Sequence, residues 1–390
     1  MSQVLARDQV QRVAGLELNA LRLAGVLPES RFEGARVPAT GTEVYDPNGE
    51  LLFHRLPISR RRLPVGFADL AVNDALAEPL LATSYGMEWN EKALLGQAAA
   101  AARKGRRSLK YDRARFVAYS YPKVAVQFLL GDQEVLMLEL GTWAVVEPSR
   151  PTNREPLRPS NFERWSLLDE LPAETRTANA RAFRKRLQVW EDPKLRRVNP
   201  ALISVETFAR LRDITIKLVD TRELHYSRRD ADHQICYELR GQRTNVWCVA
   251  ASAEMLLNFY RYEFDQVRLA QELGLGTLQN PNGLPYARVG DVVTVIDKLA
   301  CLDATMITNP GFDVFKNEIA ANRPLISFIP GHSRTVAGYT RTLLTIVNQV
   351  PYRGLLVYDP WPPNAGVITR WENFNTQTYL FAYSAVLKHV

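Results

Sequence analysis

The sequence predicts an α+β fold, in which segments with helical periodicity and groups of strands occupy separate stretches of the chain. Residues 1–26 carry apolar side chains at every third or fourth position, which favours an amphipathic helix. Residues 114–147 contain three β-rich runs, and a second helix-to-strand succession follows residue 247. At 390 residues with 46% apolar content, the chain is long enough for about two such domains.

The N-terminal elements are predicted in the following order. The helix of residues 1–26 ends near Gly25, and the turn sequence Asp46-Pro47-Asn48-Gly49 joins two strands of a hairpin. Helix-forming residues then extend over 67–103, with a break near 84–87. The three strands of residues 114–147 follow, with turns at Tyr121-Pro122 and Gly131-Asp132. We expect these elements to form a separate N-terminal α+β module.

The boundary between domains is predicted at a proline-rich stretch. Residues 148–162 contain four prolines and only Leu157 and Phe162 as large apolar side chains, as is typical of a linker. A charged helix over 173–189 follows. We therefore expect a regulatory, inhibitory or targeting module at 1–147, a linker with a charged helix at 148–205, and a second domain at 206–390.

The basic charge lies mainly in the N-terminal half. The net charge is +7, and residues 1–205 carry 30 basic and 24 acidic side chains, against 19 and 18 in residues 206–390. The densest clusters are "SRRRL" (59–63), "RKGRR" (103–107), "FRKRL" (183–187) and "KLRR" (194–197). Because they are scattered and lack interleaved aromatic residues, solvated surface explains them better than a nucleic-acid partner does.

The three cysteines indicate a reducing compartment. Cys236, Cys248 and Cys301 are too few for a disulfide framework. No run of 18 apolar residues occurs, and charges interrupt the N-terminal segment where a secretion signal would be apolar. We expect no membrane span, and either a cytoplasmic location or export without a signal peptide.

No metal or cofactor is predicted. His225, His233 and Cys236 fit no zinc spacing, and no fourth ligand follows nearby. Cys301 lies in a segment with helical apolar spacing, which indicates an inert core position.

Cys248 stands where a polar segment becomes a helix, in "GQRTNVWCVAASAEMLLNFY". Thr244 or Asn245 is the expected N-cap, which places the cysteine in the first turn. Unpaired backbone N–H groups and the helix dipole stabilise a thiolate there and lower its pKa. The alternative is a packed cysteine beside Trp247 that only begins a core helix.

Three further residues can complete a catalytic site around this cysteine. His332 follows an apolar strand and precedes another, so its imidazole is expected at the edge of a sheet. Asp359 ends a strand stopped by Pro360, and its carboxylate can orient the imidazole. The Gln242 amide can turn back towards the Cys248 backbone N–H to form an oxyanion hole. Trp361 and Trp371 either line the cleft or are buried at strand ends.

The segments "GQRTNVWCVAASAEML", "PLISFIPGHSRTVAGY" and "LLVYDPW" together resemble papain-like cysteine peptidases over residues 232–390. They are most similar to the bacterial branch, which includes leader peptidases of bacteriocin exporters and papain-like effector proteases. The resemblance implies a C-terminal domain whose first helix carries the cysteine and packs on an antiparallel sheet that carries histidine and aspartate. It also implies Cys248 as nucleophile, His332 as base, Asp359 as orienting residue and Gln242 as oxyanion donor.

The expected function is cleavage of a protein or peptide substrate, restrained by an intramolecular N-terminal segment. Papain and its close relatives have asparagine in the third position where this chain has Asp359, which is also compatible with transglutaminase-like enzymes. Two alternatives therefore stay open: a transamidase or glutamine deamidase with the same triad, and an inactive papain-like binding protein.

Overall fold

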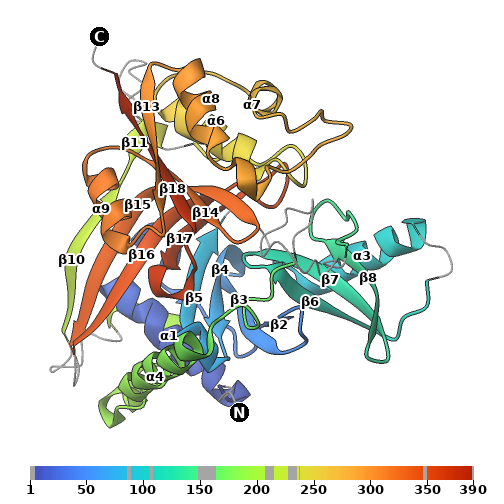
Figure 1. The fold of residues 1–390 in the computed structure, drawn as a ribbon. Helices are drawn as coiled ribbons and strands as arrows, with labels where there is room; N and C mark the ends of the chain where they lie inside the picture. Colours follow the sequence, from blue (N-terminus) through green and yellow to red (C-terminus); the bar gives the residue numbers. More distant parts are fainter. Residues whose placement is uncertain are drawn as a thin grey trace.

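A computed structural model describes residues 5–85, 89–105, 109–147, 164–206, 215–226, 235–236, 238–345 and 349–388. The predicted linker at 148–162 lies outside these residues. All but two of the described strands form one large, mainly antiparallel sheet, and helices pack around it (Figure 1). The two short strands at 225–226 and 235–236 pair only with each other. The predicted α+β class is confirmed.

The N-terminal strands form one half of this sheet. Helix α1 lies below them in Figure 1, and α3 lies beside β6–β8 at the right of the view. The elements are α1 (Arg7–Leu23), α2 (Glu29–Phe32), β1 (Ala35–Arg36), β2 (Thr42–Tyr45), β3 (Leu51–Arg60), β4 (Leu63–Ala71), η1 (Asp74–Leu76), β5 (Leu80–Tyr85), α3 (Glu91–Gly105), β6 (Arg113–Ser120), β7 (Lys123–Leu130) and β8 (Gln133–Glu139).

A helix and short elements connect the two halves. Helix α4 packs beside η1 and α1, and β9 pairs with β1, so these elements return to the N-terminal half. Strand β10 instead pairs with β15 of the C-terminal half. The elements are α4 (Ala173–Trp190), η2 (Pro193–Arg197), β9 (Leu202–Ile203), β10 (Thr215–Glu223), β11 (His225–Tyr226) and β12 (Ile235–Cys236).

The C-terminal half places helices on strands that continue the sheet. Helix α6 packs on β14 and β15, with α7 and α8 beside it at the top of Figure 1. The elements are α6 (Cys248–Phe259), α7 (Gln266–Glu272), η3 (Tyr286–Arg288), α8 (Asp291–Leu299), β13 (Leu302–Thr308), α9 (Phe312–Ala320), β14 (Leu325–Ile329), β15 (His332–Thr345), β16 (Gln349–Asp359), β17 (Val367–Asn373), η4 (Phe374–Thr376) and β18 (Phe381–Leu387).

The two halves share strand pairing and hydrophobic cores. β17 pairs antiparallel with β5, so the sheet runs from β13 at one edge to β8 at the other. One core joins α1 side chains to Tyr352 and Trp371, and another joins the β6–β8 strands to Trp361. The N-terminal strands therefore lie directly against the elements that follow β16.

Several predicted elements are confirmed. α1 ends before Gly25, which has a positive φ of 77°, and β2 and β3 pair across the predicted turn at 46–49. The three strands β6, β7 and β8 and the charged helix α4 also lie where the sequence predicts them.

The helix predicted over residues 67–103 is wrong in its first half. Residues 67–71 end β4 and residues 80–85 form β5, with the short 3-10 helix η1 between them, and only 91–105 form an α-helix. The alanine and leucine content of this segment favours a helix locally, but the end of β4 and nearly all of β5 are buried between neighbouring strands. A strand buried on both faces has no polar alternation to distinguish it from a helix.

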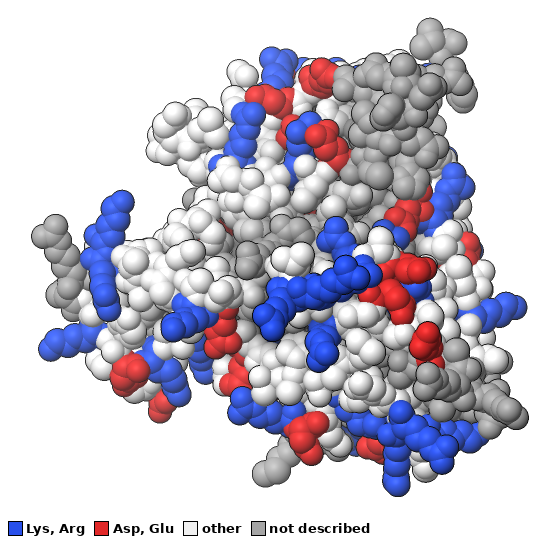
Figure 2. Space-filling view, turned by 180° about the vertical axis from the view of Figure 1, so that it is seen from behind, with Lys and Arg blue, Asp and Glu red and all other residues white. Residues whose placement is uncertain are grey.

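Basic side chains are spread over the surface. Figure 2 shows Lys and Arg on one face, separated by uncharged and acidic residues, with denser groups across the middle and along the lower edge. One member of the cluster at 183–187 departs from the predicted solvated position. Arg186 is buried and forms an ion pair of 2.6 Å with Glu17 of α1. Among the described residues, no helix is long and apolar enough to cross a membrane.

Candidate active site

Cys248 is the first residue of α6. Trp247 is the N-cap and makes no capping hydrogen bond with its side chain, so the predicted cap at Thr244 or Asn245 is wrong. Instead, the Thr244 hydroxyl accepts a hydrogen bond of 3.3 Å from the Val246 N–H, in the turn before the helix. The buried Trp247 indole donates to the Leu275 carbonyl at 3.0 Å and fixes the path of the chain into α6.

His332 and Asp359 meet at the ends of two neighbouring strands in the C-terminal half of the sheet. His332 begins β15 and Asp359 ends β16, and these strands are antiparallel neighbours, so the start of one lies beside the end of the other. His332 Nε2 and Asp359 Oδ1 are 2.6 Å apart, and each side chain is 1% exposed. Asp359 Oδ1 also accepts the Trp361 backbone N–H at 2.8 Å.

The Cys248 thiol is hydrogen-bonded to His332. Because Nε2 faces Asp359, Nδ1 is the ring nitrogen left for the thiol. Burial alone would raise the pKa of Cys248, but the hydrogen bond and charge of His332, with the charge of Lys123, lower it below its usual value. Burial would lower the pKa of His332, but Asp359 and Cys248 together raise it. Both shifts favour a thiolate–imidazolium pair.

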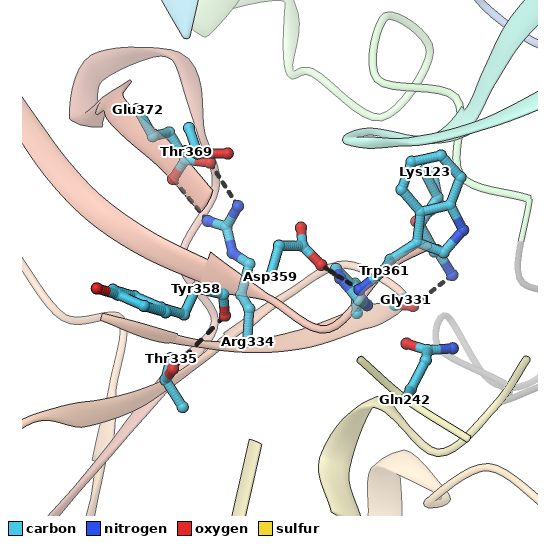
Figure 3. A network of polar contacts seen from close by, with 12 residues as sticks. Lys123, Gln242, Gly331, Arg334, Thr335, Tyr358, Asp359, Trp361, Thr369 and Glu372 are labelled. Atoms are coloured by element: carbon cyan, nitrogen blue, oxygen red, sulfur yellow. Dashed lines mark hydrogen bonds and ion pairs between the residues drawn. The ribbon is translucent and has the colours of Figure 1, made fainter. Parts of the chain in front are cut away.

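Gln242 is held by the loop that follows Asp359. Its backbone N–H donates to the Pro360 carbonyl at 2.9 Å, and its carbonyl accepts from the Asn364 N–H at 2.8 Å. At the preceding Gly241, a Cβ atom would lie 2.5 Å from the Ala365 nitrogen, so only glycine permits this close approach. The Gln242 side chain is buried, and its Nε2 donates to the Thr244 carbonyl at 2.8 Å. Figure 3 draws its side chain below Gly331 in the view.

A mainly apolar cavity opens beside Cys248 and His332. It is bounded by the first turn of α6, the loop at 283–289, the β14–β15 turn and the start of β18. Its lining residues are Lys123, Asn245, Val246, Cys248, Val249, Gly283, Leu284, Tyr286, Val289, Phe328, Ile329, Gly331, His332, Ser333, Leu380 and Phe381. Its walls are mainly apolar, and its polar groups include Lys123, Cys248 and His332.

The sequence interpretation missed the N-terminal residues at this site. Lys123 begins β7 and lines the cavity, and its Nζ donates to the Gly331 carbonyl at 2.7 Å (Figure 3). Glu139 ends β8 and accepts a hydrogen bond of 3.2 Å from the Trp361 indole. Trp361 is thus buried against the N-terminal strands. No motif identifies these contacts, because they form between residues more than 200 positions apart.

Other predicted positions fall elsewhere. Cys301 is exposed, so its prediction as a core residue is wrong: α8 ends at Leu299, and Cys301 lies in the bend before β13. Trp371 is buried and donates from its indole to the Val26 carbonyl at 2.9 Å. The side chains of His225, His233 and Cys236 lie outside the described residues. Among the side chains that are described, no group of three or more His, Cys, Asp or Glu residues could hold a metal ion.

Comparison with known families agrees with this fold. Residues 234–384 match the model of a family described as the Peptidase_C39 like family, and this segment contains Cys248, His332, Asp359 and Gln242. The class of protein defined here is the papain-like cysteine proteases, and the prediction of a cysteine peptidase is confirmed. Assignment to a bacterial branch stays a prediction.

Similar solved structures were also found. One is a double glycine motif protease from an AMS/PCAT transporter in complex with the leader peptide, 15% identical, with a TM-score of 0.27, covering 42% of this chain and 99% of that one. Another is UfSP from C. elegans, 11% identical, with a TM-score of 0.28, covering 77% of this chain and 54% of that one. This chain therefore spans about half of the second protein. No curated relative matches the sequence.

Proposed function

We propose that this chain cleaves peptide bonds with Cys248 as nucleophile, His332 as general base and acid, Asp359 as orienting residue and Gln242 as oxyanion donor. The observation that carries the proposal is the buried His332–Asp359 contact of 2.6 Å, whose imidazole is also hydrogen-bonded to Cys248 at a helix start. Asp359 holds the ring and stabilises its charged form, and the helix dipole stabilises the thiolate.

The reaction proceeds in two halves. The Cys248 thiolate attacks the scissile carbonyl carbon, and the carbonyl oxygen becomes an oxyanion held by the Cys248 backbone N–H and the Gln242 amide. The C–N bond breaks as the His332 imidazolium gives its proton to the leaving amine. Neutral His332 then takes a proton from water, which attacks the thioester and releases the acid and the thiolate.

The reaction class is tested by analysing products with wild type and Cys248→Ala. Incubation with a mixture of unstructured peptides should give new N-termini with wild type and none with Cys248→Ala. Ammonia release without new N-termini would replace hydrolysis by deamidation or transamidation, and no product of either kind would favour an inactive binding protein.

Replacing Gln242 with alanine should lower peptide turnover by about 10²- to 10³-fold, the usual effect of losing one oxyanion donor. The Gln242 Nε2 carries two hydrogens, of which one goes to the Thr244 carbonyl and the second remains for the oxyanion. Alkylation of Cys248 forms no oxyanion, so its rate should stay close to that of wild type. An equal loss in both rates would mean that Gln242 only supports the local fold.

The role of the N-terminal residues is also a proposal. Restraint by residues 1–147, as the sequence suggested, requires that weakening their contacts with the site raises turnover. The described contacts of Lys123 and Glu139 with the site support the opposite effect, which is argued next.

A further inference from the structure

We propose that the β6–β8 strands complete the active site, with Lys123 as a positioning residue for the Cys248–His332 pair. The inference rests on the proposed function and extends it to residues outside the matched segment 234–384. Two sets of contacts and one charge carry it.

The first set holds the turn that leads into His332. The β6–β7 turn lies against the β14–β15 turn: the Ser120 hydroxyl donates to the Pro330 carbonyl at 3.0 Å, and Lys123 Nζ donates to the Gly331 carbonyl at 2.7 Å. Ser120 is fully buried and Lys123 is 7% exposed, so water competes little for either bond. These bonds fix the backbone one and two residues before His332.

The second set of contacts links the end of β8 to Asp359. The buried Glu139 carboxylate accepts hydrogen bonds from the Tyr119 hydroxyl at 2.6 Å and from the Trp361 indole at 3.2 Å. The Trp361 backbone N–H in turn donates to Asp359 Oδ1, the atom that faces His332. The end of β8 is therefore linked through one tryptophan to the orienting carboxylate.

The third observation is the charge of Lys123. The titratable and charged groups around the thiol are His332 on β15, Lys123 on β7, Tyr119 on β6, Asp359 on β16 and, behind them, Glu139 on β8. Of these, His332 and Lys123 are the cations. Lys123 lines the same cavity as the thiol, and its ammonium group favours the thiolate over the neutral thiol.

A positioning role differs from a purely structural one in its pH signature. When the alkylation rate of Cys248 is plotted against pH, its rise on the acid side, the acid limb, marks formation of the thiolate. Loss of a nearby cation should therefore move the acid limb to higher pH. A shift of one pH unit lowers the thiolate fraction about tenfold at pH values below the limb. A variant that only loosens the turn would lower the rate without moving the limb.

The test uses the full chain and measures alkylation of Cys248 by limiting iodoacetamide between pH 4 and 9, read by peptide mass spectrometry. Lys123→Met should move the acid limb to higher pH and lower the alkylation rate at pH values below the limb by about three- to tenfold. Lys123→Arg, which keeps the charge, should restore the wild-type limb. The matched control is Lys110→Met, which removes the same charge from an exposed residue before β6 that does not line the cavity.

Two further variants keep the test decisive. If Lys123→Met fails to fold, Lys123→Gln, which retains a donor for the Gly331 carbonyl, replaces it in the same comparison. Ser120→Ala removes one turn contact without changing charge, and should lower the rate while the limb stays in place.

An unmoved limb in the neutral Lys123 variants, or an equal shift in Lys110→Met, would overturn the inference. Increased peptide turnover in Lys123→Met would overturn it in favour of N-terminal restraint. Failure of the proposed function looks different, because wild type itself would then alkylate slowly and without dependence on His332.

Discussion

Replacing His332 with alanine is expected to lower peptide turnover by about 10⁴- to 10⁶-fold, the range seen when one member of a nucleophile–base unit is removed. His332 both stabilises the thiolate and carries a proton to the leaving amine, so the substitution removes both of these functions. The residue also lies at the centre of the contacts: the thiol on one side and the Asp359 carboxylate, 2.6 Å away, on the other.

The same substitution should alter the pH dependence. In wild type, the active pair exists above the lowered pKa of Cys248 and below the raised pKa of His332, so turnover should follow a bell-shaped curve. Without the imidazole, the thiol should titrate nearer its ordinary value of about 8.5, and only a small part of it would be ionised at pH 6. A low-pKa thiolate is intrinsically less nucleophilic, so the net loss in alkylation at pH 6 should be about ten- to a hundredfold.

The exposed Cys301 provides an internal control for that measurement. Its labelling rate should be the same in wild type and His332→Ala, whereas that of Cys248 should fall. Equal Cys248 alkylation rates in both proteins would contradict the ion pair and favour the alternative of an inactive binding protein.

Replacing Arg334 with methionine should destabilise the protein by about 3 to 5 kcal/mol, because it leaves a charged partner buried and unpaired. Arg334 on β15 and Glu372 on β17 are 1% and 2% exposed, and Arg334 Nη2 donates to Glu372 Oε1 at 2.6 Å. The Tyr379 hydroxyl also donates to Glu372, at 2.7 Å. Figure 3 shows this pair on the side of Asp359 away from Lys123. Urea unfolding followed by tryptophan fluorescence measures the change.

Two comparisons make that result specific. Arg268→Met breaks an i,i+4 pair with Glu272 whose arginine is 51% exposed, and it should change the stability far less than Arg334→Met does, because solvent screens an exposed pair. The double variant Arg334→Met with Glu372→Gln should recover much of the loss, because the unpaired charge is removed as well. A double variant as unstable as Arg334→Met would show that the loss comes from packing.

Three of the four proposed site residues could be found in the sequence because each is marked by its immediate neighbours. Cys248 begins a run of helix formers, His332 lies between two apolar strands, and Asp359 ends a strand at a proline. These local preferences are set by backbone geometry and burial, which neighbouring residues largely determine. Their order along the chain then matched a known family.

Local preference was insufficient where long-range contacts determine the structure. The alanine and leucine residues of 67–71 and 80–85 favour a helix, yet they form strands because β4 and β5 are paired and buried within the sheet. Arg186 belongs to a charged cluster, but its partner Glu17 lies 169 residues away.

The α+β class, the papain-like segment and the residues proposed for its chemistry could all be predicted from the sequence. The positions of Lys123, Ser120 and Glu139 against the segments around His332 and Asp359 became visible only in the folded chain. A hydrogen bond between distant strands forms only where the whole sheet brings those strands together. The β6–β7 turn carries no residue pattern that specifies the β14–β15 turn as its partner.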